Sequence, residues 1–588
     1  MPRLEWIGKD KVSSHHQEVP YRVLERQYSY DENGRHDEDN GSENMIIRGD
    51  NLEALKALLP QYEGRVKCIY IDPPYNTGNE GWVYNDNVND PKINKWLGEV
   101  VGKEGEDLTR HDKWLCMMFP RLKLLQKLLA EDGAIFISID DNEFYNLRSI
   151  CNEIFGDSNF ITTIIWHKNY SPKSSAKHFS EDHDYILVYA KKAAIWRPHM
   201  MERSNKQNSL YKNPDNDPRG PWMSDNLSAR NPYSLGTYSI TCPSGRIITG
   251  PPAGRNWVIS EEKFKLYDKE GRIYWTKNGD GTPRLKRYLS DVANGIVPQT
   301  LWEYQDVGHT QDAKKQIKEI FSGDTPFSTP KPSRLIERIL QIASDPNSII
   351  LDSFAGSGTT AHAVLNMNKV DGGNRKFILV EMMDYADSIT AERVKRVISG
   401  YQADRQDVLF DEEITEKNLD KGAELLEKAK TIAKEAKGQY TTVKKPKMEN
   451  GHLRVVGIQK AKDAVAGLGG NFSFYDLGPV LLHADGNLNE EVGTQKIREY
   501  VYFMDTKERL PEEASQDEPY LMGVSRNTAY YFFYKPEKIT TLDYQFLSTI
   551  KTVADGYTIY ADACAIPDDD LRKKSITFKK IPRDIARL

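Results

Sequence analysis

Twice in this chain a short, strand-like apolar run stops at an aspartate. Residues 66–71 end at Asp72, and residues 349–351 end at Asp352. Both runs are apolar almost throughout, which is typical of strands buried on both faces of a parallel sheet. Open parallel sheets bind their ligands at the carboxyl ends of such strands. The two aspartates therefore mark the edge of a sheet at which we expect a site.

Strand and helix patterns alternate around these runs, which predicts an α/β fold with a doubly wound, Rossmann-like sheet. The expected strands span residues 45–48, 66–71, 134–139, 161–166, 185–189, 349–351 and 376–381. The expected helices span residues 51–59, 114–130, 144–155, 333–343 and 361–367. A loop-rich stretch is expected from 76 to 112.

The turn after the first run reads Asp72-Pro73-Pro74-Tyr75. Consecutive prolines donate no backbone hydrogen bonds and stiffen the chain, so the Pro73 carbonyl can be held outward as an acceptor. An exocyclic amino nitrogen is a poor nucleophile because its lone pair is delocalised into the ring. If Asp72 and the Pro73 carbonyl each accept one N–H, that lone pair becomes available, and Tyr75 can stack on an extruded base. The alternative is a purely structural turn, with Asp72 as a helix cap and Tyr75 in the core.

The turn after the second run is rich in glycine. Its residues of interest are Asp352, Phe354, Ala355, Gly356, Ser357 and Gly358. The two glycines can adopt positive φ and let a ligand lie close to the backbone. Glu381 ends the next expected strand, where a carboxylate can accept both hydroxyls of a ribose. A Gly-rich turn alone is weak evidence, but this one lacks the Gly-x-Gly-x-x-Gly spacing of dinucleotide folds.

Together the two turns resemble motifs IV and I of amino-group DNA methyltransferases, in the permuted order of the β class. The resemblance implies that Asp72, Pro73, Pro74 and Tyr75 are catalytic and that the Gly-rich turn and Glu381 bind S-adenosyl-L-methionine. It also implies that the Thr329-Pro330-Lys331-Pro332 segment closes over the cofactor, with Lys331 neutralising the cofactor carboxylate. Asp50 is a candidate acceptor for the cofactor's adenine, although a helix N-cap explains it equally well.

The segment between the two motifs is the target recognition domain in that class. Here it covers residues 196–300, where Lys and Arg are in local excess and are interleaved with Trp and Tyr. Such a segment suits binding to double-stranded DNA, and a solvated basic surface over core aromatics is the plain alternative. The other expected parts are an irregular N-terminal arm (1–44), a catalytic half (45–195), a cofactor-binding half (301–403), a charged helical connector (404–440) and a separate α+β C-terminal domain (441–588).

Composition limits the setting in which the chain works. Its 588 residues are too many for one hydrophobic core, and its formal net charge is −6. A mean hydropathy of −0.64 and the lack of a long apolar run argue against a membrane span. The five cysteines are scattered singly, which predicts reduced thiols in a cytoplasm and no metal site. The first residues carry no secretory signal pattern.

The longer string Ile71 to Gly78 and the chain length resemble the modification subunit of type III restriction-modification systems. That resemblance implies a homodimer acting on N6 of adenine, together with a separate ATP-dependent restriction subunit. The chain has no Gly-x-x-x-x-Gly-Lys-Ser/Thr phosphate loop, so we expect no ATP hydrolysis from it. The alternatives are an N4-cytosine methyltransferase and a catalytically inactive DNA-specificity protein. A glutamine-amide methyltransferase fits less well, because that family has Asn before the prolines and the opposite motif order.

Overall fold

The structure is a computed structural model. It describes residues 3–77, 95, 98 and 109–583, except 173, 175, 204–207, 277–278, 293–294, 404, 416–417, 419–420, 450, 461–463, 484, 512–516 and 537. Most of the loop-rich stretch expected from 76 to 112 therefore lies outside the described residues.

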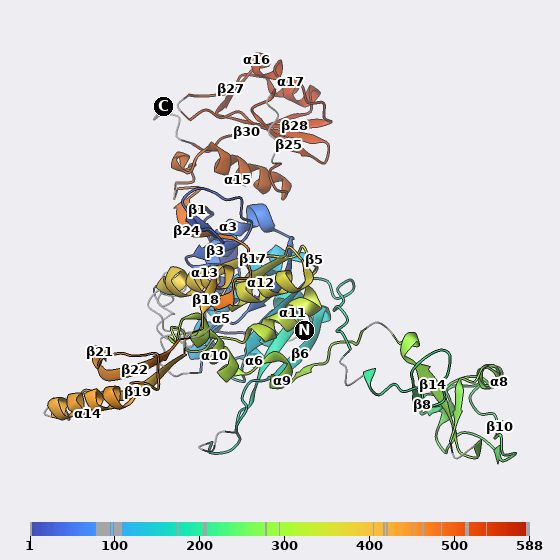
Figure 1. Cartoon of the computed structure of the whole chain (residues 1–588). Coiled ribbons are helices and arrows are strands. Elements are labelled where there is room, and N and C mark those ends of the chain that lie inside the picture. The colour runs from blue at the N-terminus through green and yellow to red at the C-terminus, as the bar shows by residue number, and fades with distance from the viewer. Residues whose placement is uncertain are drawn as a thin grey trace. The chain divides into compact units, whose positions relative to one another are not determined.

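A mixed 11-stranded sheet forms the centre of the described chain (Figure 1). In spatial order its strands are β15 (Leu301–Trp302), β6 (Phe160–His167), β7 (His183–Ala190), β5 (Leu129–Ile139), β4 (Val66–Ile71), β16 (Ile349–Asp352), β17 (Lys376–Glu381), β3 (Met45–Arg48), β24 (Phe472–Val480), β1 (Arg22–Asp31) and β2 (Gly34–His36). All seven strands expected from the sequence are present, and three of them, β3, β4 and β17, have the expected bounds.

The six adjacent strands from β5 to β24 run parallel to one another, and the sheet continues with antiparallel pairs on either side of them. From β4 the chain continues to β5, which lies next to β4 in the sheet. From β16 it continues to β17, which lies next to β16 in the opposite direction along the sheet. Strands β4 and β16 pair directly, with Leu351 opposite Ile69. The boundary between them is thus the switch point of the sheet, where open α/β sheets bind ligands.

Six helices pack in two groups around this sheet. They are α3 (Asn51–Tyr62), α5 (Arg110–Leu128), α6 (Phe144–Phe155), α11 (Ser333–Ala343), α12 (Thr359–Asp371) and α13 (Glu392–Ser399). Helix α5 contacts α3 and α6, whereas α12 contacts α11 and α13. Right-handed crossovers in opposite directions place such groups on opposite faces, which confirms the doubly wound α/β fold. In α11 the apolar spacing has its expected effect, because Leu335, Ile336, Ile339 and Leu340 are all buried.

Two expectations about the ends of the chain are wrong. Residues 1–44 are not an irregular arm, because they contain β1 and β2 and two short helices, α1 (Lys9–Val12) and α2 (His15–Glu18). Residues 441–588 are not a wholly separate domain, because β24 lies between β3 and β1 in the main sheet. Both errors have one cause: β1 and β24 are stabilised by each other, and partners this distant leave no local pattern in the sequence.

The C-terminal part continues beyond β24 with a second sheet. Its strands are β25 (Leu521–Ser525), β26 (Thr528–Phe532), β28 (Gly556–Ala561) and β30 (Ile576–Lys580), and its helices include α15 (Thr494–Thr506), α16 (Tyr544–Leu547) and α17 (Asp568–Lys573). This mixture agrees with the expected α+β character.

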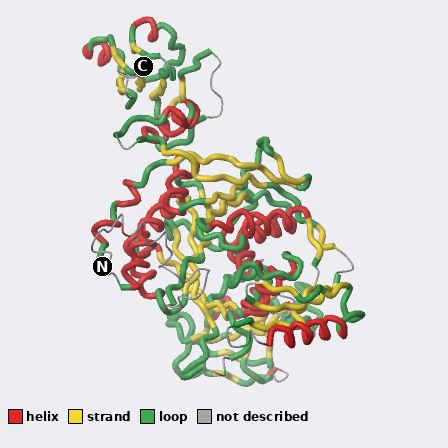
Figure 2. Tube along the Cα trace, turned by 90° about the vertical axis from the view of Figure 1, so that its left-hand side faces the viewer, coloured by secondary structure: helices red, strands yellow, loops and turns green. Residues whose placement is uncertain are grey.

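The segment expected as a helical connector is partly strand. Helix α14 (Gly422–Glu435) packs along two antiparallel strands, β19 (Arg405–Glu413) and β22 (His452–Gln459), as Figures 1 and 2 show. Short strands β20 (Thr442–Val443) and β21 (Lys447–Glu449) pair with β22. The Glu, Lys and Ala composition thus predicted α14 correctly but missed β19.

Residues 198–298 form a compact unit of their own. Its elements include β8 (Trp222–Asn226), β9 (Ser228–Ala229), β10 (Ile240–Thr241), β11 (Ile247–Ile248), β12 (Asn256–Trp257), α8 (Glu261–Lys269), β13 (Ile273–Trp275) and β14 (Pro283–Tyr288). Trp222, Trp257 and Tyr288 are buried core residues, whereas Tyr233 and Tyr274 stay more than a third exposed. The alternative of core aromatics therefore holds for the first three, and Tyr238 and Trp275 also pack against this core.

Across the described parts of the chain, no helix is long and apolar enough to span a membrane.

Candidate functional site

The turn after β4 is held in place by a buried tryptophan. The Trp114 indole N–H donates to the Pro74 carbonyl at 2.7 Å, and Trp114 is fully buried on α5. Because the Pro74 carbonyl is fixed, the preceding Pro73–Pro74 peptide, which carries the Pro73 carbonyl, is restricted in orientation as well. The sequence does not indicate this role of Trp114, because a buried tryptophan on a helix gives no signal beyond core packing.

The residue that follows the turn, Asn76, anchors it from the other side. Asn76 has a left-handed φ of 57° and is buried. Its side-chain amide donates to the Arg110 carbonyl at 3.2 Å and to the Glu143 carboxylate. Glu143 is itself fully buried and lies 2.7 Å from a ring nitrogen of His111. These contacts tie the turn to α5 and to the end of α6, and only the position of Asn76 next to the turn could have suggested them.

Asp72 has one occupied and one free carboxylate oxygen. Its Oδ2 accepts a hydrogen bond from the Lys331 ammonium. Its Oδ1 is buried and has no hydrogen-bond partner among the described residues. A buried acceptor without a partner costs free energy, so its presence indicates a group that binds there in the working protein.

Tyr75 lies next to this pair. The Lys331 ammonium is 5.0 Å from the centre of the Tyr75 ring. The Tyr75 hydroxyl is buried and finds no partner within the described ranges, and burial raises the pKa of this phenol well above its usual value. The ring rather than the hydroxyl is therefore the useful part of the side chain.

The turn after β16 is closed by its own aspartate. The two Asp352 oxygens accept from the Phe354 backbone N–H at 3.0 Å and from the Thr360 hydroxyl at 2.5 Å. Burial raises the pKa of Asp352 to about 7. Gly356 and Gly358 both have left-handed φ, 51° and 77°. The turn therefore needs glycines at these two positions, as the sequence predicted.

Glu381 reaches back from the end of β17 to this turn. Its carboxylate accepts from the Gly356 N–H at 2.8 Å and from the Met383 N–H at 3.0 Å. Burial raises its pKa to about 7. The carboxylate is thus fixed beside the Gly-rich turn, where its remaining lone pairs can accept further hydrogen bonds.

A cavity at the switch point brings several predicted residues together. Those that line it are Asp72, Lys331, Asp352, Phe354, Ala355, Gly356 and Ser357. Tyr70, Phe327 and Thr359, which sequence analysis did not single out, line it too. The lining does not include Pro73, Pro74, Tyr75, Gly358, Glu381 or Asp50. The two turns thus share one cavity, although they are separated by almost 280 residues in the sequence.

Asp50 is used by its own helix. It is the N-cap of α3 and accepts from the backbone N–H groups of Leu52 and Glu53 at 2.8 and 3.2 Å. Its other oxygen accepts from the buried Arg121 at 3.0 Å. The structure therefore bears out the N-cap interpretation and leaves a cofactor role for Asp50 as a prediction.

Two further carboxyl groups lie at the same edge of the sheet. Asp184, near the start of β7, is buried and pairs with the Lys168 ammonium at 2.5 Å. Burial raises the pKa of Asp184, and it raises that of Asp140, which follows β5, to about 6. The site is therefore rich in acidic groups, and its two lysines offset only part of the negative charge.

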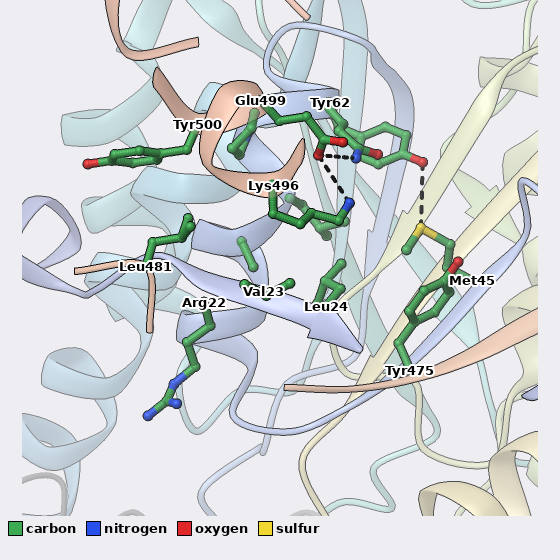
Figure 3. A pocket seen from close by; sticks show the side chains of 14 residues that line it. Arg22, Val23, Leu24, Met45, Tyr62, Tyr475, Leu481, Lys496, Glu499 and Tyr500 are labelled. Atoms are coloured by element: carbon green, nitrogen blue, oxygen red, sulfur yellow. Dashed lines mark hydrogen bonds and ion pairs between the residues drawn. The ribbon is translucent and has the colours of Figure 1, made fainter. Parts of the chain in front are cut away.

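A second cavity, shown in Figure 3, contains none of the predicted residues. It lies between α3, β1, β24 and α15. Its polar side chains already satisfy one another: Glu499 accepts from Lys496 at 3.1 Å and from Gln61 at 3.3 Å. The described residues also contain no group of three or more His, Cys, Asp or Glu side chains that could hold a metal ion. The cavity at the switch point remains the candidate site.

This geometry defines an α/β protein of a particular class: a Gly-rich turn for a bound small molecule next to a proline-stiffened acidic turn that can orient an amino group. The family model described as "DNA methylase" matches residues 66–392, which is more than half of the chain. The chain belongs to this DNA methylase family.

Curated relatives agree with this assignment. The chain is 34% identical to the type III restriction-modification enzyme StyLTI Mod subunit of Salmonella typhimurium, over 68% of this chain and 63% of the relative. It is 30% identical to the EcoP15I Mod subunit of Escherichia coli, over 68% of this chain and 66% of that protein. It is 32% identical to the type II methyltransferase M.KpnI of Klebsiella pneumoniae, over 57% of this chain and 80% of that enzyme. The matches thus span slightly less than two thirds of the two Mod subunits.

Proposed function

We propose that this chain is a site-specific DNA methyltransferase that transfers a methyl group from S-adenosyl-L-methionine to N6 of adenine in double-stranded DNA. The observation that carries the proposal is the free, buried Oδ1 of Asp72 at the carboxyl end of β4. Asp72 lines the same cavity as the Gly-rich turn of β16. Membership of the DNA methylase family supports the proposal independently.

The chain's own residues orient the amino group. Asp72 Oδ1 accepts one N–H of the extruded base, and the Pro73 carbonyl, held by the fixed turn, accepts the other. The two hydrogen bonds draw the nitrogen towards tetrahedral geometry, so that its lone pair is no longer delocalised into the ring and can react. Tyr75 stacks on the base, and this contact offsets part of the few kcal/mol that extrusion costs. Trp114 and Asn76 act indirectly, by keeping the turn rigid.

The second turn fits the cofactor. Its two left-handed glycines leave the backbone uncovered, and a Cβ at Gly356 would meet the Phe327 ring at 3.0 Å. The residues that would hold S-adenosyl-L-methionine are Asp352, Phe354, Ala355, Gly356, Ser357, Gly358 and Glu381, with Asp50 as a further candidate. Glu381 would accept hydrogen bonds from the ribose hydroxyls. When bound, the cofactor supplies an electrophilic methyl group.

DNA recognition is assigned to the unit over residues 198–298, which lies within the segment 196–300 expected from the sequence. Part of its positive charge is used internally, because Asp217 accepts from Arg219, Lys286 and Tyr288. Exposed residues such as Tyr233 and Tyr274 remain available for contacts with DNA. Replacing 196–300 with the equivalent segment of a relative should change the methylated sequence but not the methylated atom.

We further propose that the chain acts in the cytoplasm as a homodimer, and that cleavage and ATP hydrolysis belong to a separate restriction subunit. The names of the StyLTI and EcoP15I relatives, which are subunits of restriction-modification enzymes, support this assignment. The purified chain, given S-adenosyl-L-methionine, DNA, ATP and magnesium, should methylate without hydrolysing ATP or breaking strands. ATP hydrolysis that disappears with a point mutation in this chain would contradict the proposal.

The decisive experiment is methylation by the purified chain, followed by single-molecule sequencing of the DNA. N6-methyladenine in one sequence context is the expected product, and Asp72→Ala is the negative control. N4-methylcytosine would favour the alternative of a cytosine enzyme, for which the hydrogen-bonding demands on Asp72 are the same. Cofactor binding without transfer to any DNA would favour a catalytically inactive specificity protein.

A further inference from the structure

Lys331 is fixed in position by its backbone. It lies between Pro330 and Pro332, whose rings restrict φ on both sides, immediately before α11. Its carbonyl accepts from the Thr359 hydroxyl at 3.4 Å, which ties the segment to the start of α12. Its side chain is only 12% exposed. The ammonium therefore reaches Asp72 from a rigid support and not as a freely moving surface lysine.

The Lys331 ammonium contacts the Asp72 carboxylate through one oxygen and leaves the other oxygen free. It donates to Oδ2, which leaves Oδ1 without a partner in the described structure. A carboxylate held by one charged partner has a fixed rotation, so the direction of its second oxygen is determined as well. The same ammonium lies over the Tyr75 ring. One lysine thus contacts both side chains that the proposed function assigns to the target base.

The charges around Asp72 explain why such a partner is needed. Three carboxyl groups come from three other elements: Asp352 at the end of β16, Asp184 on β7 and Asp140 after β5. Asp72 acts electrostatically on Asp352 and Asp184, and the pKa values of all three groups are raised, chiefly by burial. Two phenols, Tyr70 and Tyr75, also face Asp72. Lys331 is the cation in contact with Asp72, whereas Lys168 pairs with Asp184.

We infer that Lys331 is a positioning residue for Asp72: it holds the carboxylate turned so that Oδ1 faces the amino group of the target base. This inference rests on the proposed function. It differs from the role that the family resemblance implied for Lys331, which was to neutralise the carboxylate of the cofactor. The two roles predict different losses, because one concerns the methyl-transfer step and the other concerns cofactor affinity.

The test compares Lys331→Met, which keeps the length and removes the charge, with Lys331→Arg, which keeps the charge. Lys67→Met is the matched control, since Lys67 also pairs with an aspartate, Asp132 at 2.6 Å, but at the opposite end of β4. Each full-length protein is assayed for single-turnover methyl transfer at neutral pH with saturating cofactor and DNA. Calorimetry gives the cofactor affinity, and thermal melting confirms folding.

For Lys331→Met we expect the transfer rate at neutral pH to fall about 10–100-fold. Cofactor affinity should stay within about threefold of the wild type. Lys331→Arg should recover most of the transfer rate, and Lys67→Met should match the wild type.

Two results would overturn the inference. One is an unchanged transfer rate in folded Lys331→Met. The other is a cofactor affinity that falls tenfold or more while the saturated transfer rate stays normal, which would return Lys331 to the cofactor carboxylate. If Lys331→Met does not fold, the result depends on Lys331→Arg, and a loss of tenfold or more in the transfer rate of that charge-conserving variant would equally contradict the inference. A wild-type protein that transfers no methyl group would refute the proposed function instead.

Discussion

Strands β4 and β16 are paired neighbours, and each ends at an aspartate, yet the two carboxylates are used differently. Both oxygens of Asp352 accept hydrogen bonds from its own turn. Asp72 has one oxygen on Lys331 and one that is buried and bare within the described structure. The same residue type at the same topological position therefore serves two purposes. Both oxygens of one aspartate help to build the turn proposed to bind the cofactor, and one oxygen of the other is left for a substrate.

The backbones of the two turns differ as well, since one contains prolines and the other contains glycines. Pro73 and Pro74 stiffen the first turn, which presents acceptors to a reacting group. Gly356 and Gly358 remove side chains from the second, which lets a bound molecule approach the main chain. Rigidity is needed where a lone pair must be aimed, and an open backbone is needed where a large molecule must lie. The following predictions test this division.

The largest effect should come from Asp72→Asn, which keeps the shape of the side chain and removes its charge. We expect methyl transfer to fall by about 10³-fold, because the amide oxygen will face the Lys331 ammonium, which leaves an NH2 group and no acceptor towards the amino group. Cofactor affinity, measured by calorimetry, should change only a few-fold. Transfer of labelled methyl groups near the wild-type rate would contradict the different roles given to Asp72 and Asp352.

The two glycines should not tolerate alanine equally. A Cβ at Gly358 would lie 2.9 Å from the Thr390 carbonyl oxygen, whereas one at Gly356 would meet the Phe327 ring, which can rotate. Both variants pay for a left-handed non-glycine residue, about 1 kcal/mol or more. Gly358→Ala should lose a further ~1–2 kcal/mol in stability and bind cofactor more weakly than Gly356→Ala. Thermal melts and calorimetry of the pair decide this, and equal losses would remove the steric argument.

Asp352→Asn should stabilise the protein at high pH. Burial raises the pKa of Asp352 to about 7, so the folded wild type binds a proton that the unfolded chain releases near the ordinary carboxyl pKa of 3.8. This group's contribution therefore lowers wild-type stability as the pH rises from about 4 to about 7. The variant lacks that loss, and we expect it to be more stable by about 1–2 kcal/mol at pH 8. Its advantage in melting temperature should shrink towards zero near pH 4.5, and an advantage independent of pH would contradict the assignment.

The smallest effect should come from Tyr75→Phe. The hydroxyl is buried without a partner in the described structure, so its removal should change stability by about 0.5 kcal/mol or less. Methyl transfer should be close to normal, because stacking needs the ring. Tyr75→Ala is the matched variant and should weaken handling of the extruded base, measured by 2-aminopurine fluorescence. If phenylalanine is as damaging as alanine, stacking is the wrong role.

Much of the fold could be predicted because its signals are local. The apolar runs of β4 and β17 and the spacing of α11 are each determined by one short segment. The meeting of Asp72 with the Gly-rich turn could also be predicted, since both follow parallel strands whose carboxyl ends share an edge. The parallel arrangement of the strands places residues on that edge, but it does not determine which side chains make contact there.

The remaining features depend on distant partners. Lys331 and Asp72 are 259 residues apart, and no local pattern reports their pairing. Trp114 reads as an ordinary core residue until its indole is seen on the Pro74 carbonyl. Likewise the sequence predicts an irregular segment where β1 lies, because the pairing partner of β1, β24, begins only at residue 472. Sequence patterns describe single elements well and describe poorly what only the assembled sheet brings together.

The position of β24 also has a consequence for how the protein is made. On the ribosome β3 emerges early, but the strand that covers its outer edge, β24, is among the last parts of the sheet to be synthesised. At about 5–20 residues per second, roughly 20–90 s separate the two. During that interval the nascent chain carries an open strand edge, which is a template for pairing with other chains. Because β24 is translated late, the edge of β3 stays open to pairing with other chains until synthesis is nearly complete.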